Sequence, residues 1–89
     1  MSQKITDLML QRRATRGLAA ASRMQGNNQQ AIKYLMSVLQ LSEKMGEFTG
    51  DSDAYGSIAD IYADLGDFDH AAKYYDQYIQ RMQEDGQAQ

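Results

Sequence analysis

The chain lacks cysteine and proline altogether among its 89 residues. Without cysteine it can form neither a disulfide framework nor a thiolate metal site. Without proline, and with many Ala, Gln, Leu and Met residues, it is expected to be helical throughout. Its longest apolar runs, such as residues 8–10 and 18–21, are far shorter than a membrane span.

Basic charge and targeting signals are also sparse. Nine basic residues stand against twelve acidic ones, a net charge of −3, so the basic footprint of a nucleic-acid-binding protein is missing. The first residues lead into neither a signal-peptide core nor a transit peptide. The length allows at most one small domain with a modest core. Such a chain is expected to be cytoplasmic or an internal part of a longer protein, with no direct membrane contact of its own.

What the sequence does contain is an internal repeat. When the chain is shifted by 40 residues against itself, small residues align with small and apolar with apolar, without a gap. The aligned pairs include Ala14 with Ala54, Leu18 with Ile58, Ala19 with Ala59, Gly26 with Gly66, Ala31 with Ala71 and Tyr34 with Tyr74. A repeat of about 20–50 residues is the sequence signature of a solenoid or a repeat array.

The second copy of the repeat has the pattern of a helical hairpin. One apolar face recurs at helical spacing and is formed by Tyr55, Ile58, Ala59 and Tyr62. Gly66 suits the left-handed position that ends a helix, and Asp67 can cap the next helix through its carboxylate. The facing stripe of that next helix is expected to consist of Phe68, Ala71, Ala72, Tyr75, Tyr78 and Ile79. The small Ala59 and Ala71 would allow the two helices to approach closely.

This spacing resembles the signature of the tetratricopeptide repeat family. The residues that carry the resemblance are Tyr55, Ile58, Ala59, Tyr62, Gly66, Ala71, Tyr75 and Tyr78. The first copy fits more loosely, because Ser22 stands where the family prefers an aromatic residue and Thr15 where it prefers a large one. The resemblance covers residues 12 to about 85. It implies an all-α fold, a tetratricopeptide-type α-solenoid of two helix-turn-helix hairpins, and a role in protein binding.

From these patterns we expect helices over residues 12–25, 28–45, 52–65 and 68–84. Residues 1–11 would be a helical extension or the tail of a preceding repeat, followed by repeat 1 (12–51), repeat 2 (52–85) and a frayed C-terminus (86–89). In the link between the repeats, Gly46 and Gly50 permit a turn, and Asp51 or Ser52 is expected to cap the third helix. The abrupt N-terminal end predicts a part of a longer array or a terminal piece of a larger protein. A consequence would be a homodimer that forms through the uncapped N-terminal face.

The candidate binding site is the concave groove that the first helices of such hairpins line. Side chains that point away from the packed stripe form the predicted groove, namely Arg13, Arg16, Ala20, Arg23 and Met24 in repeat 1, and Asp53, Ser57, Asp60, Ala63 and Asp64 in repeat 2. A groove that is basic in one repeat and acidic in the other fits a protein partner that carries both charges. The alternative is that these charges solvate an exposed face or pair with each other. Each exposed ion pair would then stabilise the fold by about 0–1 kcal/mol. A clamp for a C-terminal carboxylate is disfavoured, because Ala20 replaces the asparagine that it needs and Asp60 would repel the carboxylate.

No catalytic, metal or cofactor site is expected. His70 is the only histidine, too few for a metal site, and is assigned to the helix surface. The acidic Asp64, Asp67 and Asp69 lack the loop and the terminal glutamate of a calcium site. No serine stands in a plausible arrangement with the histidine and a third partner. The tyrosines of the second repeat are assigned to the core or the groove edge, namely Tyr62, Tyr74, Tyr75 and Tyr78. The chain is therefore not expected to be an enzyme.

Longer strings carry a closer resemblance. Residues 16–21, 30–34, 53–60 and 75–81 resemble the C-terminal repeat domain of the FLU (fluorescent in blue light) family of plastid regulators. That resemblance implies a negative regulator of tetrapyrrole and chlorophyll biosynthesis, which binds glutamyl-tRNA reductase through its groove. It also implies a chloroplast location, with membrane association through segments absent from this chain. Residues 54–56, 66–68 and 71–75 also resemble the 40-residue repeats of the spindle-orientation adaptor LGN, which implies a peptide-binding adaptor or scaffold. A structural segment of a longer array is the remaining interpretation.

Overall fold

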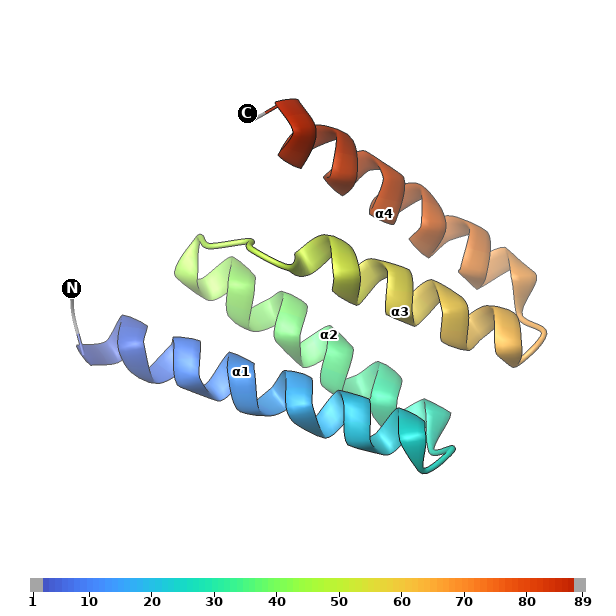
Figure 1. Cartoon of the computed structure of the whole chain (residues 1–89), viewed down its shortest axis with the longest axis horizontal. Helices are drawn as coiled ribbons and strands as arrows, with labels where there is room; N and C mark the ends of the chain where they lie inside the picture. The colour runs from blue at the N-terminus through green and yellow to red at the C-terminus, as the bar shows by residue number, and fades with distance from the viewer. Residues whose placement is uncertain (1–2, 88–89) are drawn as a thin grey trace. The chain divides into compact units, whose positions relative to one another are not determined.

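Two helical hairpins make up the described part of the chain (Figure 1). The computed structural model describes residues 3–87, and its helices are α1 (Gln3–Met24), α2 (Asn28–Met45), α3 (Asp51–Asp64) and α4 (Phe68–Gln87). α1 packs on α2 and α3 packs on α4, and the chain divides into two compact units between Thr49 and Gly50. Residues 3–87 contain no strand, so the predicted all-α architecture is confirmed.

The helix bounds agree with those predicted except at the two outer ends. α2 has the predicted limits, and α3 lies a single residue closer to the N-terminus than expected. α1 begins at Gln3, so residues 3–11 continue the first helix without a break. α4 continues to Gln87 instead of ending at 84, and residues 88–89 of the segment expected to fray lie outside the described residues.

The turn inside each hairpin is closed by a glycine and a side-chain cap. Gly26 and Gly66 have φ angles of 78° and 80°, in the left-handed region that glycine adopts without strain. Asn27 accepts a hydrogen bond from the Gln30 N–H, and Asp67 accepts one from the His70 N–H, each at 3.3 Å. The predicted roles of Gly66 and Asp67 are therefore confirmed.

His70 also forms a side-chain contact with this cap. Its Nδ1 lies 2.8 Å from Asp67 Oδ2, and its ring stacks on Tyr62 with the ring centroids 5.0 Å apart. The side-chain hydrogen bond from His70 is the main reason that the pKa of Asp67 lies below its ordinary value. The single histidine thus has a local structural role at the start of α4, on the exposed surface to which the sequence assigned it.

The link between the hairpins turns at two glycines, but it ends differently from the prediction. Gly46 and Gly50 have φ angles of 65° and 83°, as their expected turning role requires. The expectation that Asp51 or Ser52 caps α3 is wrong, because the cap position is Gly50 and no side-chain hydrogen bond caps this helix. The left-handed Gly50 brings the chain into helical geometry one residue earlier. Asp51 therefore lies inside the first turn, where it is buried.

The core of each hairpin consists mainly of small and branched residues. The buried apolar side chains of the first hairpin are those of Ala19, Ala31, Leu35, Val38 and Leu41. Those of the second are Ala54, Ile58, Ala59, Ile61 and Ala71. Ala59 and Ala71 are 0% and 3% exposed, which agrees with their expected place where two helices meet.

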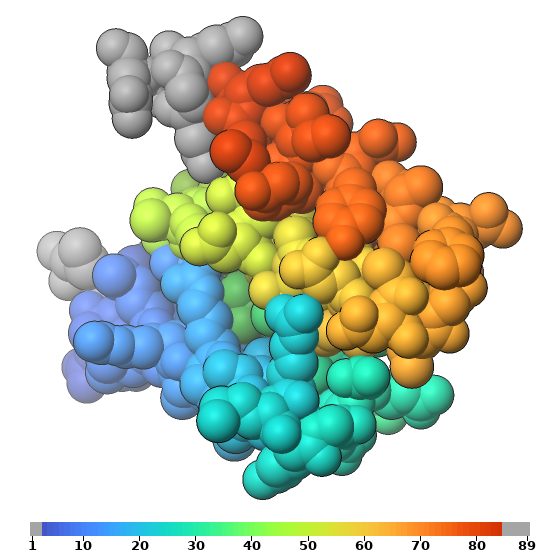
Figure 2. Space-filling view, turned by 45° about the vertical axis from the view of Figure 1, so that its right-hand side comes forward, coloured from blue at the N-terminus to red at the C-terminus, as the bar shows by residue number. Residues whose placement is uncertain are grey.

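The predicted apolar stripe of α4 is only partly correct. Ala71 is buried and Tyr75 and Tyr78 are half-buried, but Phe68 and Ile79 are 69% and 51% exposed. Ala72 is exposed as well. The reason is the width of the stripe around the helix. α3 packs on the face of α4 that carries Ala71 and Tyr78, and a single helix cannot cover the whole stripe. Side chains of α4, coloured orange to red, form much of the surface in view in Figure 2.

A buried arginine ties α1 to the end of the first hairpin. Arg12 is only 5% exposed and donates hydrogen bonds to Ser42 Oγ at 2.8 Å and to the Glu47 carbonyl oxygen at 2.6 Å. Its guanidinium also pairs with the Glu47 carboxylate. Hydrogen bonds from the Thr49 side chain, from Arg12 and from the Thr49 backbone lower the pKa of Glu47 from 4.5 to about 2. The sequence pattern does not predict the burial of Arg12, because an arginine in a helix normally indicates an exposed position.

Candidate functional site

The predicted site residues of repeat 1 lie on the accessible part of α1. Arg13, Ala20, Arg23 and Met24 are exposed, with Met24 at 89%. Arg16 is half-buried, and its Nη2 donates a hydrogen bond to the Thr49 carbonyl oxygen at 2.7 Å. Arg16 therefore holds the link after α2 in place as well as adding positive charge to this surface.

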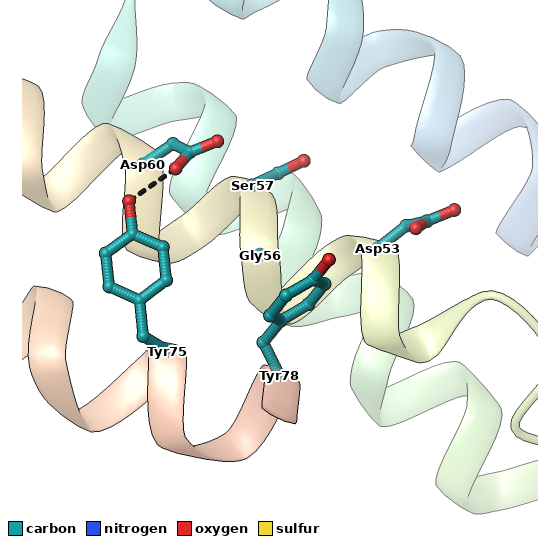
Figure 3. Close-up of a pocket in the computed structure, with 6 residues that line it drawn as sticks. All are labelled: Asp53, Gly56, Ser57, Asp60, Tyr75 and Tyr78. Carbon is teal, nitrogen blue, oxygen red and sulfur yellow. Dashed lines mark hydrogen bonds between the residues drawn. The ribbon is translucent and has the colours of Figure 1, made fainter. Parts of the chain in front are cut away.

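The predicted site residues of repeat 2 share one face of α3. Asp53, Asp60 and Asp64 are exposed, and Ser57 is half-buried. Their spacing of four, three and four residues places them on one side of the helix. Figure 3 shows the side chains of Asp53, Ser57 and Asp60 projecting from the same side of α3. Ala63, the fifth predicted residue, is half-buried.

Three of these residues line a pocket within the second hairpin, which we call the α3–α4 pocket (Figure 3). Its volume is about 330 Å³, and it is lined by Asp53, Gly56, Ser57, Asp60, Tyr75 and Tyr78. The Tyr75 hydroxyl donates a hydrogen bond to the Asp60 carboxylate. The sequence assigned both tyrosines to the core or the groove edge, whereas the structure makes them the α4 wall of this pocket.

Gly56 determines how closely the Tyr78 ring of this wall packs against α3. A Cβ atom at this position would lie 3.0 Å from Cδ1 and 3.2 Å from Cε1 of Tyr78. The phenol ring therefore rests directly against the backbone of α3, and a larger residue at position 56 would require the ring to shift by a few tenths of an ångström. A glycine inside an otherwise helical pattern is the sequence signal that could have indicated such close packing.

Stacked aromatic rings hold α4 against α3. The ring centroids of Tyr55 and Tyr74 are 6.4 Å apart, and those of Tyr74 and Tyr62 are 5.7 Å apart. The Arg81 guanidinium lies 5.8 Å from the Tyr55 centroid, within cation–π range. Burial, with smaller contributions from Tyr62 and Tyr55, raises the pKa of Tyr74 above its ordinary value. These contacts keep the helices that carry the pocket in a fixed register.

The first hairpin has a smaller pocket between α1 and α2, of about 240 Å³. It is lined by Gln11, Thr15, Tyr34, Ser37, Gln40, Leu41 and Lys44. Among the described residues, no group of three histidine, cysteine or acidic side chains is arranged to hold a metal ion. No helix in the same part of the chain is both long and apolar enough to cross a membrane.

Comparisons with known proteins agree with this architecture. The family profile described as tetratricopeptide repeat matches residues 10–84. The chain is 41% identical over 85 residues to protein FLUORESCENT IN BLUE LIGHT, chloroplastic, from Arabidopsis thaliana; the match covers 96% of this chain and 27% of that protein. The chain thus spans about a quarter of the length of that relative.

A solved structure shows the same relationship. The crystal structure of the TPR (tetratricopeptide repeat) domain of Arabidopsis FLU superposes with a TM-score of 0.82 and 42% sequence identity, covering 91% of this chain and 68% of that one. The resemblances to the repeat family and to the FLU repeat domain, which were inferred from the residues, are confirmed.

Proposed function

This chain belongs to the tetratricopeptide repeat family, and on that premise we propose that it is a non-catalytic protein-binding module with a FLU-like regulatory role. The observation that carries the proposal is the match in both sequence and structure to the FLU repeat domain. Repeat hairpins of this kind offer extended concave surfaces suited to protein ligands.

The partner that we propose is glutamyl-tRNA reductase, and the pathway is tetrapyrrole synthesis in the chloroplast. This proposal is supported by the similarity to FLU, whose Arabidopsis form is named as chloroplastic. Membrane association would depend on segments outside this sequence, as expected for a FLU-like regulator.

The binding surface that we propose has a basic and an acidic part. The basic part is the exposed face of α1 with Arg13, Arg16, Ala20, Arg23 and Met24, and the acidic part is the face of α3 with Asp53, Ser57, Asp60 and Asp64. A partner that fits both parts must carry both charges, and rim charges of this kind mainly affect association rate and specificity.

The proposal is tested by isothermal titration calorimetry of the chain with purified glutamyl-tRNA reductase. Wild type should bind, and the double variant Arg13→Glu/Arg23→Glu should bind at least about tenfold more weakly, since it reverses charge at the interface. Arg16 is left unchanged because it also holds Thr49. Lys33→Glu, an exposed position on α2, serves as the matched charge-reversal control and should bind like wild type.

Two results would contradict this proposal. If the wild-type chain does not bind the reductase, the proposed partner is wrong. If the arginine variant and the Lys33 control bind equally well, with helicity unchanged by circular dichroism, the proposed surface is wrong.

A second candidate is a structural segment that stacks on further repeats or on a second copy. The observation that favours it is the exposure of large apolar side chains on α1 and α4, with Leu10 and Leu18 of α1 at 59% and 49% and Phe68 of α4 at 69%. Light scattering over a concentration series separates the candidates. Self-association abolished by Leu10→Gln/Leu18→Gln would support stacking, whereas a monomer at every concentration would oppose pairing with a second copy.

A further inference from the structure

The α3–α4 pocket combines negative charge with an aromatic wall. Asp53 and Asp60 lie seven residues apart on α3, about 10 Å along the helix axis, with the Ser57 hydroxyl between them. The rings of Tyr75 and Tyr78 come from α4 on the other side (Figure 3). None of the six lining residues is basic.

This lining excludes several classes of ligand. An anion would be repelled by the carboxylates, and an apolar group would strip water from them without replacing their hydrogen bonds. The pocket offers two carboxylates with no third acidic, histidine or cysteine ligand in its wall, which is a poor set for a metal ion. A volume of about 330 Å³ is at the lower limit of small-molecule sites, about 300–1,000 Å³. An organic cation the size of a side chain is the class that fits.

We infer that the α3–α4 pocket receives the guanidinium group of an arginine side chain from the bound protein. The inference deepens the proposed function and rests on it, because the arginine is supplied by the protein partner. It predicts that this part of the partner's surface is basic, opposite in charge to the part that meets the arginines of α1.

The geometry favours arginine over lysine. A guanidinium is planar, so it can lie over the face of a phenol ring while its N–H groups point at a carboxylate. The α3–α4 pocket presents both groups, with the Tyr78 ring held against the helix backbone by Gly56. An ammonium group is a compact, strongly hydrated charge and gains less from a flat aromatic wall.

The test begins with a probe that does not depend on the partner's identity. N-acetyl-L-arginine amide is titrated into the ¹⁵N-labelled chain, and amide shifts are followed by NMR. We expect saturable shifts around Asp53, Gly56 and Ser57 at millimolar probe concentration. N-acetyl-L-citrulline amide has nearly the same shape without the charge and should give no saturable shift there.

The second arm measures binding to glutamyl-tRNA reductase. Asp53→Asn should weaken binding about tenfold, because it removes a charge-assisted hydrogen bond. Asp69→Asn is the matched control, since Asp69 is also an acidic residue in the first turn of its helix but does not line the pocket. The control should change affinity less than twofold, and circular dichroism checks that both variants are folded.

The outcomes separate this inference from the proposed function. If the reductase binds but Asp53→Asn matches its control and the arginine probe gives no saturable shift, the arginine pocket is wrong while the proposed partner stands. If the arginine probe binds at the pocket and the reductase does not bind, the pocket chemistry stands and the proposed partner is wrong. Equal shifts with the citrulline probe would overturn the role of charge.

Discussion

Glu47→Gln is expected to destabilise the first hairpin by an amount that depends on pH. The Glu47 carboxylate pairs with the buried Arg12 and accepts a hydrogen bond from the Thr49 N–H at 2.9 Å. Glutamine keeps the size of the side chain and an acceptor oxygen but removes the charge. The substitution therefore measures the electrostatic part of this cluster, with little change in packing.

The expected magnitude follows from the pKa of Glu47. A pKa lowered from 4.5 to about 2 corresponds to about 3 kcal/mol of stabilisation of the charged form in the folded state. The Glu47 side chain keeps 40% of its surface exposed, so solvent screening reduces this amount. We expect the free energy of unfolding at pH 7 to fall by about 1.5 kcal/mol.

The pH dependence has a definite sign. Because the folded pKa of Glu47 is lowered, its stabilising effect is complete above the unfolded value of 4.5 and is lost as the pH falls through about 2. The glutamine variant lacks this titration. The difference in unfolding free energy between wild type and variant should therefore shrink from about 1.5 kcal/mol at pH 7 to nearly zero by pH 2.

The assay is urea unfolding followed by circular dichroism at several pH values. Taking the difference between two proteins cancels the titration of all other carboxylates. Glu43→Gln, an exposed position near the end of α2, is the matched control and should change the free energy of unfolding by less than about 0.5 kcal/mol. The reasoning is refuted if the Glu47 variant is as stable as this control at pH 7, or if its deficit stays constant down to pH 2.

Four further substitutions test the backbone and cap assignments by the same unfolding assay. Gly17→Ala should raise the free energy of unfolding by about 0.5–1 kcal/mol, because Gly17 lies within α1 and no atom lies near the position of its missing Cβ. Gly56→Ala should raise it less or lower it, because the new Cβ would meet Tyr78. Equal gains for the two variants would contradict the close packing at Gly56. Gly66→Ala should cost about 1 kcal/mol or more, because φ is 80° there; no loss would mean that the turn can relax. Asn27→Ala should cost about 1 kcal/mol by removing the cap of α2, and an unchanged midpoint would rule out that cap.

Much of the fold could be predicted from local pattern. The helical spacing of apolar residues locates all four helices, and a left-handed glycine followed by a capping side chain marks the turn in each hairpin. Ala59 and Ala71 identify where α3 and α4 meet because only small residues permit a close approach. The charged faces of α1 and α3 could also be predicted, since the helical period that locates the apolar residues also locates the solvent-facing positions.

Other features could not be predicted because they depend on contacts between distant residues. Arg12 and Glu47 are 35 positions apart, and no local pattern indicates that an arginine on α1 will be buried against the end of the first hairpin. The exposure of Phe68 and Ile79 depends on which face of α4 packs against another helix. An apolar stripe in the sequence does not indicate how many helices will pack against it.

The sequence by itself determined a pair of helical hairpins, the turns that close them, the repeat family and the charge on each first helix. These follow from period, turn chemistry and residue type, which act over a few residues. Only the tertiary structure decided that Arg12 is buried, that Asp51 lies inside α3, and that Tyr75 and Tyr78 form the wall of a pocket with Asp53 and Asp60. Those outcomes depend on the register in which two helices pack, and that register is set by contacts such as the one between Gly56 and Tyr78, 22 residues apart in the chain.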